Sequence, residues 1–206
     1  MADDALRSEL LAHDDVARLA RALRKHPGAQ ATVGEEVRLS AILVTLRIAA
    51  DGEPELLMIK RAELERDPWS GHIACPGGRM EPQDEDLKAT ALRETLEETG
   101  VDVSRDGLVL GTLDDLWPRT PRLPPILIRP YVAVVQPDVR IVPSTEVAAA
   151  FWVPLAALRE PAAWAIRPVQ VRHAGEWQVE TFQHGEYTVW GLTERVLRNF
   201  LARLDD

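Results

Sequence analysis

Apolar residues recur at helical spacing near both ends of the chain. Toward the N-terminus they share one face, with basic residues opposite, which predicts a helix within residues 3–26 that is capped by Asp14 or Asp15. Toward the C-terminus the same spacing follows Trp190 and Gly191 and predicts a closing helix that packs on a core. The two apolar stripes consist of Val16, Leu19 and Leu23, and of Val196, Phe200 and Leu204.

Between these helices the pattern is that of strands, because runs of β-branched and aliphatic residues are separated by turn signals. The predicted strands cover residues 37–48, 55–60, 107–113, 126–135, 147–153 and parts of 163–190, with a short helix at 155–159. This order predicts an α+β fold in which a mixed β-sheet lies between helices. We assign residues 1–35 to an N-terminal helical extension and residues 36–206 to the main domain. The extension packs on that domain, or it forms a homodimer or partner contact.

One helical stretch interrupts the strands and ends at Gly100, a residue type that often follows a helix C-terminus. On a wheel with 3.6 residues per turn, Glu94, Glu97 and Glu98 share one face. The opposite face should pack on the core and consists of Ala89, Leu92 and Leu96.

The carboxylate face of this stretch is unfavourable for a simple surface helix. Like charges at i, i+4 destabilise a helix by a few tenths of a kcal/mol, and carboxylates in the last turn face the negative end of the helix dipole. A departure of this kind indicates a functional site. Carboxylates that converge on one point suit a hard cation such as Mg²⁺ or Mn²⁺, and the alternative is a solvated acidic face.

Composition narrows the classes of protein further. A net charge of −9 and a pI near 5.1 oppose non-specific binding to nucleic acids or anionic membranes. Cys75 is the only cysteine, which excludes an internal disulfide or a cysteine-based zinc site, and we expect it to be buried as a small apolar residue. The chain has no apolar run of membrane-spanning length and no visible signal peptide, so we expect a soluble cytoplasmic protein.

The spacing around the helical stretch closely resembles the Nudix box, usually written G-x5-E-x7-R-E-U-x-E-E-x-G-U, where U is aliphatic. Gly78, Glu85 and the run from Arg93 to Val101 match it, with Thr95 at the first U position. Six residues instead of five separate Gly78 from Glu85. Either the turn is one residue longer, or Asp84 takes the acidic role. We prefer Glu85, because it keeps the seven-residue gap to Arg93.

The segment before the box is similar to that of the coenzyme A diphosphatase-like branch, with a pattern near L-L-T-x-R-S-x3-R-x3-G-x3-F-P-G-G. The residues that match this pattern are Leu57, Arg61, Arg66, Gly71, Pro76, Gly77 and Gly78. Ile59, Ala62 and Cys75 depart from it, and the gap from Arg66 to Gly71 is one residue longer. These departures weaken the coenzyme A assignment and leave the superfamily assignment unchanged.

Further residues are candidates for binding substrate. Arg61 and Arg66 can pair with phosphates through their planar guanidinium groups, or they bridge to nearby acidic residues. Trp69 stacks on a base or covers the core. Arg119 and Arg122 lie in a proline-rich loop that forms a substrate wall or is simply solvated. Glu146 precedes a strand that looks like its Nudix counterpart, where a Glu sometimes reaches the site as an extra ligand or base.

The resemblance implies a Nudix fold and hydrolysis of a diphosphate linkage in a nucleoside diphosphate derivative, aided by Mg²⁺ or Mn²⁺. Glu94 and Glu98 would be the main metal ligands, with Glu97 as a ligand or base and a main-chain oxygen near Gly78 as a further ligand. Arg93 and Glu85 would hold the glutamates in place. The first substrate hypothesis is coenzyme A or acyl-coenzyme A. The alternatives are ADP-ribose, nucleotide sugars or nucleoside triphosphates, and a non-catalytic nucleotide sensor.

Overall fold

The computed structural model describes residues 2–34, 36–64, 69–118, 125–171 and 175–205. The elements follow one another as α1 (Ala2–Leu10), α2 (Asp14–Lys25), β1 (Arg38–Ile48), β2 (Pro54–Arg61), β3 (Ile73–Ala74), β4 (Gly77–Arg79), α3 (Leu87–Thr99), α4 (Val103–Asp106), β5 (Gly107–Thr112), β6 (Ile126–Val135), β7 (Val147–Pro154), α5 (Leu155–Arg159), the 3-10 turn η1 (Pro161–Ala163), β8 (Trp164–Val171), β9 (Gly175–His184), β10 (Tyr187–Trp190) and α6 (Leu192–Asp205). The predicted strands and the short helix at 155–159 are therefore confirmed, whereas β3, β4 and α4 are too short to have been predicted from periodicity.

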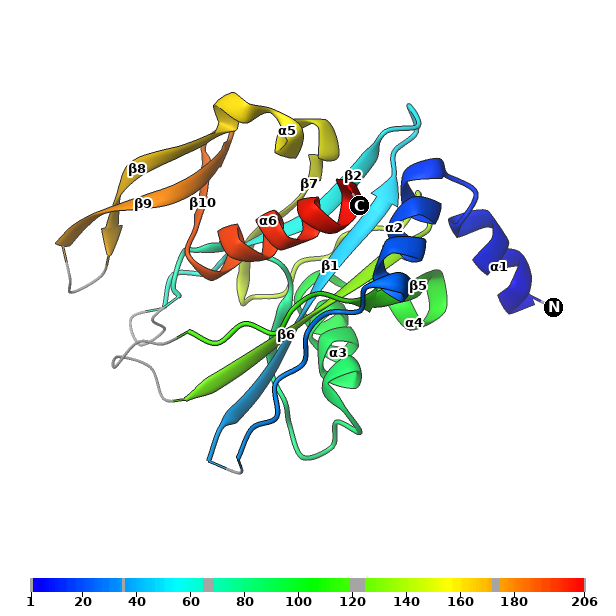
Figure 1. The fold of residues 1–206 in the computed structure, drawn as a ribbon, viewed down its shortest axis with the longest axis horizontal. Coiled ribbons are helices and arrows are strands. Elements are labelled where there is room, and N and C mark those ends of the chain that lie inside the picture. The colour runs from blue at the N-terminus through cyan, green and yellow to red at the C-terminus, as the bar shows by residue number, and fades with distance from the viewer. Residues whose placement is uncertain (1, 35, 65–68, 119–124, 172–174, 206) are drawn as a thin grey trace.

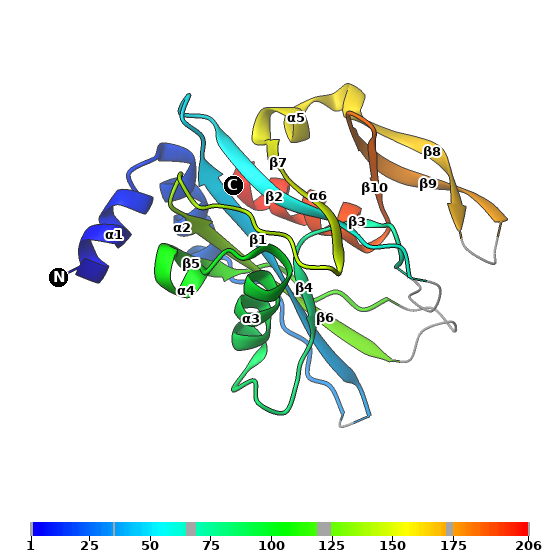
Figure 2. The same ribbon diagram turned by 180° about the vertical axis from the view of Figure 1, so that it is seen from behind.

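The main sheet is mixed, as predicted. Its strands follow the order β3-β2-β1-β6-β5, β4 pairs with β1, and β7 pairs with β2. β1 and β6 are parallel neighbours, whereas the other paired strands of this sheet are antiparallel. β8, β9 and β10 form a separate antiparallel sheet, whose β8–β9 hairpin extends to the end of the molecule opposite the N-terminus (Figures 1 and 2).

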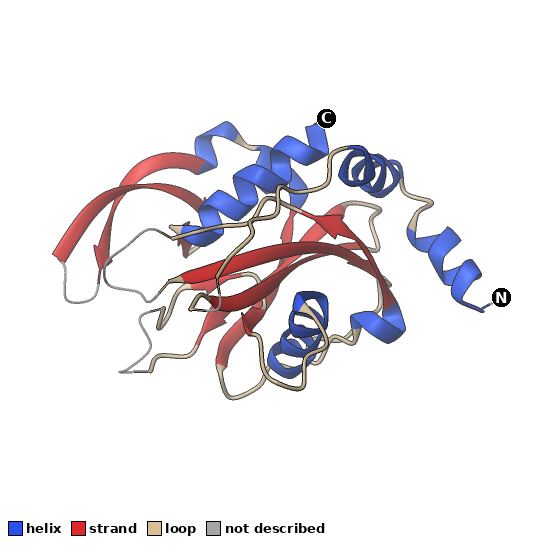
Figure 3. Cartoon of the chain, turned by 60° about the horizontal axis from the view of Figure 1, so that its bottom comes forward, coloured by secondary structure: helices blue, strands red, loops and turns tan. Residues whose placement is uncertain are grey.

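Helices cover both faces of the main sheet (Figure 3). Alternate residues of β1 point to opposite faces, because side chains alternate along a strand. Ala41 and Leu43 join a core cluster with Leu87 and Ala91 of α3, and Val44 and Leu46 join another with residues of α2 and α6. The chain therefore has the α+β layers expected from its sequence.

The N-terminal segment contributes to this core. It forms two helices instead of one, with His13 at the N-cap of α2, so the prediction of an Asp14 or Asp15 cap is wrong. Both aspartates lie in the first turn, where the helix dipole favours negative charge. The predicted apolar stripe is buried, and Leu19 and Leu23 belong to the same cluster as Phe200 of α6. The boundary at residue 35 stays a prediction.

The closing helix α6 is as predicted, because its stripe of Val196, Phe200 and Leu204 is buried. Among the described residues, no helix is both long and apolar enough to cross a bilayer.

Candidate active site

Helix α3 has clear end signals. The side chain of Asp86 accepts a hydrogen bond from the amide of Ala89 at 2.7 Å, which caps the N-terminus. Gly100 has φ +72°, and its amide donates to the carbonyl of Leu96, which ends the helix as predicted.

The buried face of α3 differs from the one predicted. Leu96 is 44% exposed, and Ala89 and Leu92 are only partly buried. Leu87, Ala91, Thr95 and Glu98 form the buried side instead. Small residues at positions 91 and 95 let the helix lie close to β1 and β4, and the hydroxyl of Thr95 donates to the carbonyl of Ala91, so it can be buried without an unmade hydrogen bond. Packing on this face carries Glu98 into the protein interior.

The carboxylates of Glu94 and Glu98 lie beside the glycine pair of the box. Glu98 is 5% exposed at its side chain and accepts hydrogen bonds from the Gly77 amide at 2.9 Å and from Nη1 of Arg61 at 3.4 Å. A Cβ atom placed on Gly78 would lie 2.4 Å from the carboxylate carbon of Glu94. Gly77 has φ +152°, and a Cβ there would lie 2.3 Å from the carbonyl oxygen of Ala41. The glycines are therefore required by the close approach of β4 to both β1 and α3.

One cavity of about 790 Å³ collects most of the candidate residues. It is lined by residues of β1, β4 and β6 of the main sheet, by the start of α6 and by residues of the small β8–β10 sheet. The predicted residues that line it are Arg61, Trp69, Gly78, Glu94, Glu98 and Glu146. Positions that are distant in the sequence thus meet at one place, as expected for a site.

Glu146 is brought to the cavity by the segment that docks on the end of α3. The last carbonyls of a helix have no partner within it. Here the carbonyls of Glu98 and Thr99 accept from the amides of Ser144 and Val142 at 3.0 and 2.7 Å. This anchoring places Glu146 near enough to Glu94 and Glu98 for its charge to act on both.

The two α3 carboxylates are held in an environment that opposes their charge. Burial raises the pKa of Glu98 to about 7, although the Gly77 amide and the Arg61 guanidinium oppose the shift. Burial also raises the pKa of Glu94, against the opposing effect of Arg93. The negative charge of Glu146 also raises the pKa of each of the two carboxylates. A bound cation would relieve the burial penalty and the mutual repulsion.

Two other charged residues of the motif, Glu97 and Arg93, lie outside the cavity. Glu97 does not line it; its side chain is 58% exposed and accepts from Arg93 at 3.0 Å. Its role as a ligand or base stays a prediction. Arg93 also donates to Glu94 at 3.0 Å and to the main-chain oxygen of Arg79 at 3.0 Å, so it ties α3 to β4 as a positioning residue should.

The acidic partner of Arg93 is Asp84, and the preference for Glu85 is corrected. Nε and Nη2 of Arg93 donate to the two carboxylate oxygens of Asp84, each at 2.9 Å. Asp84 also accepts from the Thr90 hydroxyl and the Glu81 amide. Glu85 is exposed, and in the described part of the chain no hydrogen bond links it to Arg93. It precedes the N-cap, so the extra residue of the motif lies after the acidic position and the turn keeps its usual length.

The remaining sequence candidates divide into two groups. Arg66, Arg119 and Arg122 lie outside the described residues. Cys75 is 3% exposed, and burial raises the pKa of its thiol to about 12, which confirms the expectation of an inert apolar residue.

Sequence reasoning missed several lining residues. Arg79 adds a cation beside the glycine pair, and its place directly after Gly78 was the available signal. His72 packs on Trp190 with ring centroids 4.6 Å apart, and Trp177 lies on β9. The sequence analysis did not single out these three residues as cavity-lining, because the fold brings their separate segments together.

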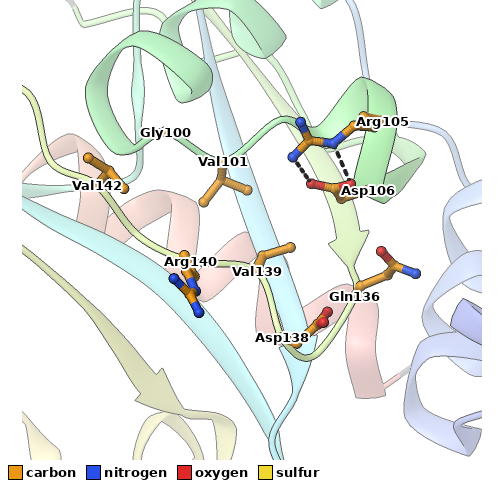
Figure 4. A pocket seen from close by; sticks show the side chains of 9 residues that line it. All are labelled: Gly100, Val101, Arg105, Asp106, Gln136, Asp138, Val139, Arg140 and Val142. Carbon is orange, nitrogen blue, oxygen red and sulfur yellow. Dashed lines mark hydrogen bonds and ion pairs between the residues drawn. The ribbon is translucent and has the colours of Figure 1, made fainter.

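A second, smaller hollow of about 390 Å³ lies beyond the C-terminal end of α3 (Figure 4). It is lined by Gly100, Val101 and residues of the 105–106 and 136–142 segments, and Arg105 is paired with Asp106 across one side. It shares no lining residue with the larger cavity.

The donor set of the larger cavity fits a magnesium ion. Among the described residues, no three His, Cys, Asp or Glu side chains are close enough to hold a metal together. Mg²⁺ does not require such a cluster, because it retains several waters and is commonly held by one or two carboxylates together with substrate phosphates. Glu94 and Glu98, one helical turn apart, can supply those carboxylates.

Comparison with known proteins identifies the family of the chain. The family model of the NUDIX domain matches residues 37–173, which is more than half of the chain. The chain belongs to the Nudix family. This Nudix chain is 31% identical over 185 residues to the mitochondrial coenzyme A diphosphatase of Homo sapiens, covering 89% of the chain and 76% of that protein. It is 31% identical to the uncharacterized Nudix hydrolase NudL of Klebsiella pneumoniae, covering 99% and 98%.

Coverage of other relatives is smaller. The peroxisomal coenzyme A diphosphatase of Caenorhabditis elegans is 33% identical over 141 residues, and the match spans 67% of the Nudix chain and 56% of that protein. Among solved structures, a NUDIX hydrolase from Alicyclobacillus acidocaldarius has a TM-score of 0.54 at 21% identity, covering 82% of the chain and 93% of that structure. That structural likeness supports the Nudix fold alone.

Proposed function

We propose that this Nudix chain hydrolyses the diphosphate linkage of coenzyme A or an acyl-coenzyme A in the presence of Mg²⁺ or Mn²⁺. The observation that carries the proposal is the pair of carboxylates of the partly buried Glu94 and the buried Glu98, which lines one cavity together with Arg61 and Glu146. Burial of like charges is unfavourable unless a cation joins them. The kinship with the two named coenzyme A diphosphatases favours that substrate.

The metal's contribution is electrostatic: when bound, Mg²⁺ neutralises diphosphate charge and orients the phosphoryl group. Glu94 and Glu98 would hold the ion, with the main chain near Gly78 as a further donor. Arg93, anchored by Asp84, fixes the rotamer of Glu94. Arg61 exchanges its long contact with Glu98 for an oxygen of the diphosphate, to which a guanidinium can donate two hydrogen bonds.

The reaction is a displacement at phosphorus. A water oxygen forms the new P–O bond, the bond from that phosphorus to the bridging oxygen breaks, and the bridging oxygen leaves with the other phosphate. Glu146 would accept the proton of the water; its place in the cavity lining and the effect of its charge on both α3 carboxylates support this role. With coenzyme A the products are adenosine 3′,5′-bisphosphate and 4′-phosphopantetheine.

The test is a substrate panel with purified protein, comprising coenzyme A, acetyl-coenzyme A, ADP-ribose, a nucleotide sugar and a nucleoside triphosphate. Products are separated by chromatography with Mg²⁺ and with EDTA. We expect metal-dependent turnover of the coenzyme A compounds. Turnover of ADP-ribose far above coenzyme A would refute the substrate assignment, and no turnover of any diphosphate by folded protein would favour a sensor.

Matched glutamine variants test the site itself. Glu94→Gln and Glu98→Gln should each lower kcat by at least about 100-fold, because each removes a metal ligand. Glu97→Gln, which alters an exposed carboxylate of the same helix, is the comparison that measures whether Glu97 also takes part. Near-normal activity of Glu98→Gln would contradict the metal assignment.

A further inference from the structure

The linker between α2 and β1, residues 26–34, pairs with the chain at the end of β5. The amide of Gly28 donates to the carbonyl of Thr112 at 3.1 Å. Further along, the amide of Asp115 donates to the carbonyl of Ala29 at 2.9 Å. Because β5 is the last strand in the order of the main sheet, this pairing places the linker at the edge of that sheet.

Asp115 connects the linker to β6. Its carboxylate accepts from the Ala31 amide at 2.8 Å and from Nε and Nη2 of Arg129, both at 2.8 Å. The side chain of Asp115 is 4% exposed, so these donors compensate a charge that has left water. The next residue, Leu116, exchanges backbone hydrogen bonds with Ile128 of β6 at 2.8 and 2.9 Å, and both residues line the larger cavity. The position of this part of the lining thus depends on Asp115 and on the linker amide that it accepts.

Asp114 connects the linker to α6. It accepts from the amide of Ala29 at 2.8 Å, from Nδ2 of Asn199 at 3.0 Å and from Nη2 of Arg203 at 3.1 Å. The first turn of α6, from Leu192, belongs to the lining of the cavity. Two adjacent aspartates therefore tie one short stretch of the linker to two elements that line the cavity.

The helix before the linker packs against the same part of the lining. Leu23 of α2 belongs to one buried cluster with Leu116 and Ile128. Among the described residues 2–34, however, none lines the cavity itself. An effect of the N-terminal segment on substrate must therefore pass through the residues that it holds in place.

We propose that residues 28–31 are a positioning element of the larger cavity. They hold the pair Asp114 and Asp115, which in turn holds Leu116 and α6 in the lining. The carboxylate of Glu98 is held by α3 and by an amide of β4 instead, so displacing the linker should weaken substrate binding more than it slows the chemical step. The proposal rests on the proposed function, because it takes this cavity to bind the substrate.

Gly28→Ala displaces the linker without changing a charge. The added Cβ would lie 2.0 Å from the carbonyl oxygen of Leu113, where ordinary contact begins at 3.4 Å, so one of the two backbones must shift by more than an ångström. Misplacement of that size can cost about 100-fold in catalysis, and we expect kcat/KM for coenzyme A to fall by about 10- to 100-fold. Most of the loss should be a higher KM, with kcat within about threefold of the wild-type value.

The matched control is Gly34→Ala in the same linker. Gly34 does not have a positive φ, and no described atom lies within 4 Å of the position that its Cβ would take. This variant should keep the wild-type kcat and KM. Asp114→Asn is a milder second variant, because the side chain of Asp114 is 38% exposed, and it should raise KM a few-fold by removing one acceptor oxygen. Near-ultraviolet circular dichroism checks that each variant is folded.

Hydrogen exchange read by mass spectrometry tests the coupling without a substrate. The amides of Asp115 and Leu116 donate to the linker and to β6, so in Gly28→Ala both should exchange at least about 10-fold faster than in the wild-type protein. The amide of Gly77, which donates to Glu98, should keep its wild-type rate. Faster exchange at all three amides would overturn the inference, because the substitution would then loosen the whole domain.

Two results separate this inference from the proposed function. If no diphosphate is hydrolysed but exchange rises only beside the linker, the proposed activity fails and the hold of the linker on the cavity lining stands. If coenzyme A is hydrolysed and Gly28→Ala matches Gly34→Ala in KM and in exchange, the positioning role fails and the activity stands. An unchanged KM with a lower kcat would also overturn the inference, because the linker would then act on the chemical step.

Discussion

Replacing Asp84 by Asn tests whether this residue, and not Glu85, anchors the box. In the wild-type protein the Arg93 guanidinium donates to both carboxylate oxygens of Asp84. Asn keeps the size of the side chain but offers Arg93 only one acceptor oxygen, beside an NH₂ group that cannot accept. The Asp84 side chain is only 3% exposed, so the pair is a buried one. The Arg93 guanidinium holds the pKa of Asp84 well below its usual range, which adds stability at every pH above the acid range and loses it only in strong acid.

The expected loss of stability in Asp84→Asn follows from these contacts. Removing one partner of a buried ion pair destabilises a protein by about 3–5 kcal/mol, and Arg93 retains Glu94 and the Arg79 carbonyl, so we expect about 3 kcal/mol. For a chain of this length that corresponds to a fall in Tm of about 6–12 °C. Urea unfolding at pH 7.5 in EDTA measures it directly.

The matched control for this change is Glu85→Gln. It alters an exposed carboxylate next in sequence and should shift the free energy of unfolding by less than about 0.5 kcal/mol. Asp84→Asn should also lower kcat by about 10-fold or more, because Arg93 would no longer be anchored to hold the Glu94 carboxylate in place. If Glu85→Gln proves the more damaging of the two, the assignment of Asp84 is refuted.

Two further predictions concern stability. In metal-free protein the raised pKa of Glu98 contributes stability that is complete below pH 4.5 and is lost as the pH rises through about 7. Glu98→Gln should therefore be more stable than the wild-type protein at pH 8, by up to about 3 kcal/mol. Near pH 4.5 the two proteins should be equally stable. Denaturation series at the two pH values in EDTA measure this, and an unchanged difference would argue against burial as the cause. Leu19→Ala should lower the free energy of unfolding by about 2–5 kcal/mol because Leu19 is fully buried, whereas Arg21→Ala on the exposed face of α2 should change it little. Equal, small effects would show that α2 does not stabilise the domain.

The sequence predicted the fold well where a period or a spacing was strong. Runs such as 126–135 are long and apolar, and α3 is bounded by an N-cap and a glycine, so both could be predicted from local chemistry. The spacing of the box singled out Glu94 and Glu98, and both line the cavity. Family resemblance supplied the Nudix layers, because periodicity alone does not give strand order.

The errors arose where tertiary packing decided the outcome. A helical wheel ranks Leu above Thr as a core residue, yet Thr95 is buried and Leu96 is exposed, because a short side chain lets α3 approach the sheet. Counting residues favoured Glu85, but the N-cap at Asp86 turns that side chain outward. No local signal placed Trp177 and residues of β6 in the lining of one cavity, since that depends on how the two sheets meet.

The parallel pairing of β1 with β6 has a consequence for folding. The partners Arg38 and Ile126 lie far apart in sequence, and the glycine pair, α3 and the proline-rich segment all belong to the loop that joins them. Closing a long loop is entropically unfavourable and delays the contacts that depend on it. Glu98 reaches Gly77 where β4 pairs with β1, which involves only residues inside that loop, whereas Ile126 and Ile128 join the cavity lining only once β6 has paired with β1. A chain stalled before that pairing could hold Glu98 against Gly77 but would lack the part of the cavity lining that β6 supplies.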